Sequence, residues 1–172
     1  ATALATAPAA LVQQYCTRVI YPYFAALWRE TPEKLAEHYY ARPRKVRLFY
    51  TLAVGAAVGL APLAVEILYD HRYSPVAAYL AILLISPCLA MNNTIANEAM
   101  VASGRVSMTL TMNIVRVLWL LVGGVAGYVA LGTMGEVIAV GTIEVGAMFY
   151  SWSVLMRMGI FKARQEVLTL FA

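Results

Sequence analysis

The segment that decides the fold is VSMTLTMNIVRVLWLLVGGVAGYVAL, residues 106–131, in which Arg116 is the sole charged residue. A helix that crosses the hydrocarbon core of a bilayer needs about 20 mainly apolar residues, so this segment predicts a membrane span. Outward from it in both directions, four further segments have a suitable length and composition. The predicted fold class is an all-α, polytopic transmembrane helix bundle in a single transmembrane domain, residues 1–172, with spans at about 1–28, 46–69, 75–101, 106–131 and 136–156.

The overall composition is that of a membrane protein. Hydrophobic residues make up 62% of the chain and charged residues 13%, whereas a soluble domain carries about 25% charged residues. No basic stripe with interleaved aromatic residues accompanies the net charge of +4, so we expect no nucleic-acid partner. Cys16 and Cys88 lie in apolar segments without metal-ligand spacing. We therefore expect them to be small buried residues, and we expect no metal or cofactor.

The positively charged residues predict how the chain threads through the membrane. If the chain crosses at each helix, Arg72 lies on one side, Arg18 and Arg116 lie within the bilayer, and the other ten of the 13 cations share the opposite side. The positive-inside rule makes that side cytoplasmic, which places the 29–47 loop and the C-terminus there. The ten cytoplasmic cations are Arg29, Lys34, Arg42, Arg44, Lys45, Arg47, Arg105, Arg157, Lys162 and Arg164.

The segments outside the central spans carry further signals. Thr31, Pro32 and Glu33 suit the N-cap and first turn of a helix, so a short cytoplasmic helix is predicted over 32–41, ending before Pro43. Pro22 is expected to kink the first span. The chain begins inside an apolar stretch without Met, so we expect it to be part of a longer protein. The tail after residue 156 suits either an interfacial helix or the start of another span.

Polar residues at bilayer depth are candidate sites, because they are costly there and usually face a protein interior or a water-filled cavity. Arg116 and Glu144 lie in spans joined by a short turn and are predicted to form an intramembrane ion pair. That pair either fixes the packing of the two helices or relays charge. A second polar group, expected to form hydrogen bonds between helices, consists of Asn92, Asn93, Asn97 and Glu98.

Gln14 and Arg18 form a third candidate site in the first span. They lie one helical turn apart and share a face. One interpretation is a substrate cavity in which the guanidinium binds an anionic group. The other is that the helix tilts and Arg18 extends to the cytoplasmic interface.

Two further patterns complete the sequence-based expectations. Gly55 and Gly59, and likewise Gly123 and Gly127, have the spacing that permits close approach of helix backbones. The sequence has no Gly-rich phosphate loop, no H-E-x-x-H motif, no clustered carboxylate pair and no nucleophile elbow. We therefore expect no catalytic residues and no enzyme activity.

Several motifs occur in an order that resembles one family of membrane transporters. Residues 19–27, VIYPYFAAL, resemble the end of the eighth span in polysaccharide flippases of the multidrug/oligosaccharidyl-lipid/polysaccharide exporter superfamily, and residues 31–35, TPEKL, resemble the loop helix that follows. Residues 61–77 resemble the exit of the ninth span, with Asp70 where the family has Gly. Residues 100–105, MVASGR, resemble the turn after the tenth span. The five predicted spans would then match spans eight to twelve, the C-terminal part of such a transporter.

The resemblance implies a flippase that translocates lipid-linked oligosaccharide or polysaccharide repeat units across the bacterial inner (plasma) membrane, in cell-surface polysaccharide biosynthesis. Its expected partners are the lipid bilayer, a lipid-linked pyrophosphate oligosaccharide and, as a further option, other polysaccharide-assembly membrane proteins. Gln14 and Arg18 would then lie beside the substrate pyrophosphate. The alternatives are a drug or cation antiporter of the same superfamily, with Glu144 as its acidic coupling residue, a membrane-embedded transferase, and a small membrane scaffold that transports nothing.

Overall fold

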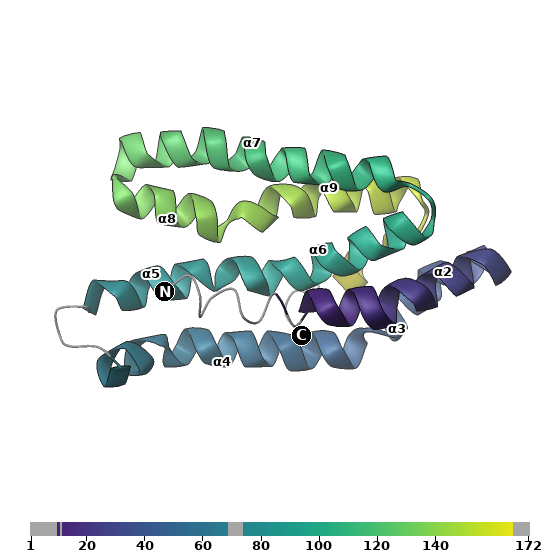
Figure 1. Ribbon diagram of the computed structural model, residues 1–172, viewed down its shortest axis with the longest axis horizontal. Coiled ribbons are helices and arrows are strands. Elements are labelled where there is room, and N and C mark those ends of the chain that lie inside the picture. Colours follow the sequence, from purple (N-terminus) through teal and green to yellow (C-terminus); the bar gives the residue numbers. More distant parts are fainter. Residues whose placement is uncertain (1–9, 11, 69–73, 167–172) are drawn as a thin grey trace.

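The protein is an all-α helix bundle. The computed structural model describes residues 10, 12–68 and 74–166, and no strand occurs among them. The helices lie side by side along the long axis of the molecule (Figure 1). Their bounds are η1 Cys16–Ile20, α2 Tyr21–Glu30, η2 Pro32–Lys34, α3 Leu35–Ala41, α4 Arg44–Leu68, α5 Ser74–Leu83, α6 Ile85–Ala102, α7 Val106–Leu131, α8 Thr133–Gly141 and α9 Ile143–Arg157.

Four helical stretches in the described part are long and apolar enough to cross a membrane. They cover Pro32–Leu63, Ala78–Ala102, Val106–Leu131 and Thr133–Arg157. Each overlaps one of the last four predicted spans, and the first also includes the predicted loop helix at 32–41. Much of the first predicted span, 1–28, is described as helix from residue 12 onward. Residues 1–9 and Leu11 of that span, residues 69–73 with Arg72 and most of the predicted turn at 70–74, and tail residues 167–172 lie outside the described residues.

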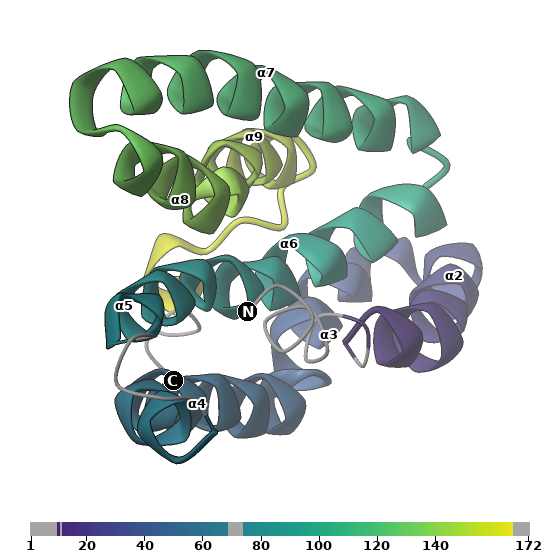
Figure 2. The ribbon, with the colours of Figure 1, turned by 60° about the vertical axis from the view of Figure 1, so that its left-hand side comes forward.

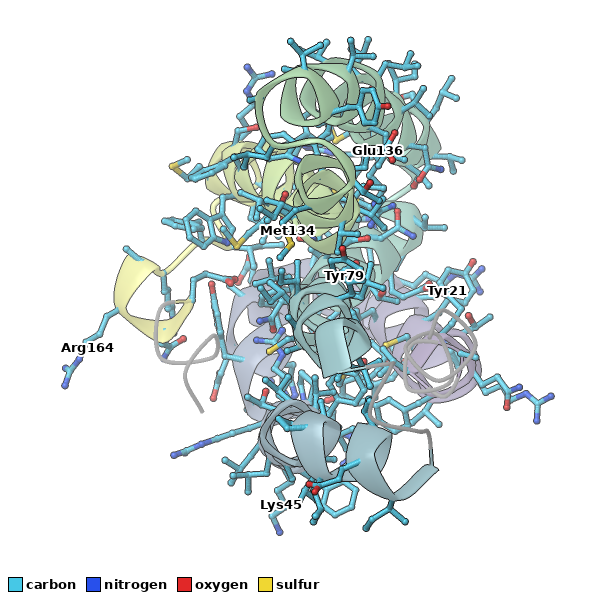
Figure 3. All side chains as sticks on the ribbon, turned by 90° about the vertical axis from the view of Figure 1, so that its left-hand side faces the viewer. Tyr21, Lys45, Tyr79, Met134, Glu136 and Arg164 are labelled. Carbon is cyan, nitrogen blue, oxygen red and sulfur yellow. The ribbon has the colours of Figure 1, made fainter. Side chains whose placement is uncertain are left out.

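Successive spans run in alternate directions, so one end of the bundle collects the basic connectors. The loop containing α3, the turn at Ser103–Arg105 and the segment after α9 all lie at this end, and the turn at Gly132 lies at the other (Figure 1). We call the first end the cation-rich end. Viewed along the helices, Lys45 and Arg164 extend outward from the bundle (Figure 3). The grouping of cations predicted from the sequence is therefore present in the fold.

Proline determines where two of the spans deviate from a regular α-helix. Pro22 has no N–H for the carbonyl of Arg18, and its ring would clash with that carbonyl in an α-helix. The preceding turn widens into the π-helix η1, in which the Tyr21 N–H bonds the Cys16 carbonyl instead. Pro87 likewise cannot donate to Leu83, where α5 ends. The kink expected at Pro22 thus takes the form of a π-helix.

Glycine permits close packing at one of the two predicted positions. A Cβ at Gly127 on α7 would lie 2.6 Å from the Gly135 carbonyl oxygen on α8, so the two backbones are in contact there. The expectation for Gly55 and Gly59 is wrong within the described residues, since a Cβ at either position would meet no atom within 4 Å. Both lie on a face of α4 that no neighbouring helix covers in this part of the chain.

The apolar core joins the first span to α6 and to the cytoplasmic-loop helix. Cys16, Ile20 and Phe24 are fully buried and pack in one cluster with Ile95 of α6 and Tyr39 of α3. Cys16 is thus a buried residue, as expected, whereas Cys88 is half-buried. Large apolar residues of α4 and α7 instead point outward, among them Phe49, Leu52, Ile67, Val122, Val125 and Val129. This distribution fits helices whose outer faces contact lipid.

The short helix in the 29–47 loop is present over η2 and α3, and it ends at Ala41, before Pro43. Thr31 occupies the N-cap position, but its side chain makes no capping hydrogen bond. Thr31 is therefore the N-cap residue, as predicted, without a side-chain hydrogen bond. The reason is that the first turn is a 3₁₀ turn, in which the Lys34 N–H bonds the Thr31 backbone carbonyl at 3.0 Å, so the donor that the hydroxyl would have bonded is already satisfied.

The tail after α9 folds back onto α3. The Tyr40 hydroxyl donates to Glu166 Oε1 at 3.0 Å and accepts a hydrogen bond from the Lys162 backbone N–H, also at 3.0 Å. Ile160 and Glu166 are buried. Arg47 lies in the same region, with its guanidinium 5.1 Å from the centre of the Tyr39 ring. These contacts place residues 160–166 against the loop at the cation-rich end.

Candidate functional site

A polar pocket of about 270 Å³ lies between the first span, α6 and α7. α6 lies between α2 and α7 (Figure 2), and the first span, α6 and α7 each contribute side chains to the pocket. The pocket is lined by Gln13, Thr94, Asn97, Thr109, Met112, Asn113 and Arg116. Six of these seven side chains are polar, in a bundle whose exposed residues on α4 and α7 are largely apolar.

Helical spacing explains why α7 contributes four of these side chains. Thr109, Met112, Asn113 and Arg116 are separated by three, one and three residues, so they share one face of the helix. At about 1.5 Å per residue, Thr109 lies about 5 Å along α7 from Val106 and Arg116 about 15 Å along it. The pocket therefore extends from near the cation-rich end to the middle of the span.

An ion pair forms the deep end of the pocket. Arg116 Nη2 lies 2.8 Å from Glu144 Oε2, with 22% and 11% of the two side chains exposed. Arg116 Nη1 donates to Asn113 Oδ1 at 2.9 Å. The two ionised groups neutralise each other, which removes most of the cost of placing them at bilayer depth. The predicted pair thus connects α7 to α9 and holds the guanidinium at the pocket wall.

Glu144 is also bonded to α6, which extends the network across three helices. Asn93 Nδ2 donates to Glu144 Oε2 at 2.7 Å and to the Glu144 backbone carbonyl at 2.9 Å. The Ser151 hydroxyl donates to Asn93 Oδ1 at 3.2 Å. Asn93 is 1% exposed, so this part of the network is closed to the pocket and serves to hold Glu144.

The predicted polar group on α6 divides between two environments. Asn97 lines the pocket and accepts a hydrogen bond from the Thr109 hydroxyl at 2.7 Å, which joins α6 to α7. Asn93 joins α6 to α9 as described above. Asn92 and Glu98 are buried away from the pocket. Hydrogen bonding between helices is therefore observed for Asn93 and Asn97.

The structure does not place Gln14 and Arg18 in the pocket. Both are exposed on the outer face of the first span. Their neighbour Gln13 lines the pocket instead, with its Nε2 donating to the Thr17 hydroxyl at 3.4 Å. The sequence alone could not say which face of this helix α6 would cover.

Five pocket residues were not predicted from the sequence, namely Gln13, Thr94, Thr109, Met112 and Asn113. A signal for two of them existed, because Thr109, Asn113 and Arg116 form a polar stripe at helical spacing along an otherwise apolar span. For Gln13 and Thr94 the deciding information is tertiary. Each becomes part of the site because its own helix turns that residue toward α7.

Comparisons with protein-family models, with curated proteins and with solved structures find no match to this chain. Among the described residues, no group of three or more His, Cys, Asp or Glu side chains could hold a metal ion.

Proposed function

We propose that the protein is a multi-pass membrane transporter that translocates lipid-linked oligosaccharide or polysaccharide repeat units across the bacterial inner membrane. The observation that supports this proposal most directly is the polar pocket, which extends about 10 Å along α7, from Thr109 to Arg116, in a bundle whose outer faces are apolar. Polar cavities at bilayer depth are typical of substrate pathways. The lipid class comes from the resemblance of residues 19–27, 31–35, 61–77 and 100–105 to polysaccharide flippases.

The geometry suits transport of a lipid-linked substrate. The pocket is open on one side rather than enclosed, so a polar headgroup can enter it while the lipid chain stays among the apolar outer faces of the helices. No bond of the substrate is broken in such a step, so the protein needs binding groups rather than catalytic groups. The positive-inside rule orients the cation-rich end, with the 29–47 loop and the C-terminus, toward the cytoplasm.

The antiporter alternative has less support. It needs an intramembrane carboxylate that exchanges ions, and the candidate was Glu144. That carboxylate forms an ion pair with Arg116 and accepts a hydrogen bond from Asn93. Protein groups therefore already occupy the Glu144 oxygen that would have to bind the exchanged ion. A scaffold that transports nothing would not need a polar pocket at bilayer depth.

Transport is tested with the full-length polypeptide in sealed liposomes that contain a fluorescent lipid-linked oligosaccharide in both leaflets. A membrane-impermeant reagent that quenches the fluorophore then reports how much of the lipid reaches the outer leaflet. The expected result is complete quenching with the protein, and about half quenching with protein-free liposomes. Quenching that stays at half with a correctly folded protein would rule out the transporter.

Arg18 is tested in the same assay because its role is separate from the pocket. If this exposed guanidinium binds the substrate pyrophosphate, Arg18→Gln slows translocation while the amount of folded protein is unchanged. Arg29→Gln, an exposed cation at the end of α2, is the matched control. Equal translocation by wild type and Arg18→Gln would remove Arg18 from the substrate path.

A further inference from the structure

The polar side chains of the pocket offer a ligand both hydrogen-bond donors and hydrogen-bond acceptors. Asn97 Oδ1 is occupied by Thr109, and Asn113 Oδ1 is occupied by Arg116, so within the described part of the chain each amide keeps its N–H groups for another acceptor. Gln13 uses its Nε2 on Thr17, and the Thr94 hydroxyl donates to the Ala90 carbonyl at 2.8 Å. These two side chains therefore keep oxygen lone pairs for another donor.

The pocket carries little net charge. Arg116 is the one charged side chain among the residues that line it, and its charge is balanced by Glu144 at 2.8 Å. One of its terminal nitrogens is also occupied by Asn113 at 2.9 Å. A phosphate in the pocket would have to compete with the Glu144 carboxylate for the Arg116 guanidinium. A cation in the pocket would be repelled by that guanidinium.

This combination selects an uncharged ligand that both donates and accepts hydrogen bonds. A hydroxyl does both, whereas a phosphate at neutral pH mainly accepts and an ammonium group only donates. Met112, which is buried in the pocket wall, adds an apolar contact for carbon-bound hydrogens. We infer that this pocket binds an uncharged sugar ring of the transported oligosaccharide, and not its pyrophosphate.

The identity of the sugar as part of a transported oligosaccharide rests on the proposed function. The size of the pocket fits one part of that substrate. Ligand pockets for drug-sized molecules have volumes of roughly 300–1,000 Å³, so a pocket of about 270 Å³ suits one ring rather than a whole repeat unit. The remaining rings and the pyrophosphate then lie outside it. Asn97 and Asn113 act as donors to the ring hydroxyls, and Gln13 and Thr94 act as acceptors.

Binding is tested with the full-length protein in a zwitterionic detergent, using three soluble probes: a free disaccharide, inorganic pyrophosphate and methylammonium. A ligand that binds the folded state raises the melting temperature in proportion to its affinity. The expected result is a concentration-dependent rise with the disaccharide and a smaller rise or none with the two ions. A larger rise with pyrophosphate, lost when Asn113 is changed, would overturn the assignment.

Variants link that binding to the pocket. Asn113→Leu removes an exposed amide, and Asn97→Leu removes an amide that also joins two helices, so the first variant is the one expected to fold normally. Losing one hydrogen bond should raise the disaccharide concentration needed for a given shift by up to roughly tenfold. Thr111→Val, exposed on α7 outside the pocket, should match wild type. Equal disaccharide binding by wild type and Asn113→Leu would overturn the inference.

The outcomes separate this inference from the proposed function. If the liposome assay shows translocation but disaccharide binding does not depend on Asn97 or Asn113, the sugar pocket is wrong and the transporter stands. If disaccharide binding depends on both residues but no lipid is translocated, the pocket stands and the transporter is wrong.

Discussion

Arg116 on α7 and Glu144 on α9 are joined by a 2.8 Å contact between Nη2 and Oε2, and Glu144 is held in turn by Asn93 on α6. One carboxylate thus connects three helices at bilayer depth. The same contact fixes the guanidinium at the end of the polar pocket. The packing of these helices and the position of Arg116 in the pocket wall therefore depend on the same pair.

Removing one member of this pair should destabilise the bundle. Arg116→Ala leaves Glu144 partly buried without its counterion, which costs about 3 kcal/mol, the lower end of the range for breaking a buried pair, since Arg116 is 22% exposed. The measurement is the melting temperature and the amount of protein recovered from membranes. Exchanging the charges, with Arg116→Glu and Glu144→Arg in one protein, should restore part of the loss. Identical behaviour of the single and the exchanged variants would contradict a stabilising pair.

The contact between α7 and α8 should not tolerate a side chain at Gly135. A Cβ there would overlap the backbone of Gly127, and overpacking of this kind costs about 1–3 kcal/mol or more. Gly135→Ala should therefore lower the melting temperature strongly. Gly124→Ala is the matched control on α7, because a Cβ there meets no atom within 4 Å and alanine favours a helix by about 0.5–1 kcal/mol. A Gly135→Ala protein as stable as the Gly124→Ala protein would mean that the two helices are farther apart.

Docking of the tail should depend on the Tyr40 hydroxyl. Tyr40→Phe removes the hydrogen bonds to Glu166 and to the Lys162 N–H; a neutral hydrogen bond contributes about 0.5–1.5 kcal/mol and one to a charged group about 1.5–3 kcal/mol. The tail should then detach more often, and trypsin should cleave after Lys162 and Arg164 several times faster than in wild type. Tyr21→Phe, a half-buried position on α2, should leave the cleavage rate unchanged. Equal rates in all three proteins would show that the tail is held by other contacts.

The threading through the membrane can be checked with single cysteines in a protein that carries Cys16→Ala and Cys88→Ala. Lys45→Cys lies at the cation-rich end and Glu136→Cys at the start of α8, near the opposite end. In intact cells stripped of their outer layers, a membrane-impermeant maleimide should label Glu136→Cys alone. Lys45→Cys and a third variant, Arg164→Cys, should react once the membrane is permeabilised. Labelling of Lys45→Cys and Glu136→Cys from the same side would refute the alternating order of spans.

The sequence by itself determined the fold class and the grouping of the cations at one end. Both follow from local composition, because apolar blocks of bilayer length must satisfy their own backbone hydrogen bonds as helices. The same argument placed α7 at Val106–Leu131, and the short turn at Gly132 made Arg116 and Glu144 neighbours. Helical spacing also put Gln14 and Arg18 on one face.

The tertiary structure alone decided which polar residues face one another. Gln13 rather than Gln14 lines the pocket, and Gly127 rather than Gly55 meets a neighbouring backbone, although each pair looks alike in sequence. The rotation of a helix about its axis is set by the sum of its contacts with neighbouring helices. In a membrane span, where lipid and protein interior are equally apolar, the pattern of hydrophobic residues along the chain does not encode that rotation.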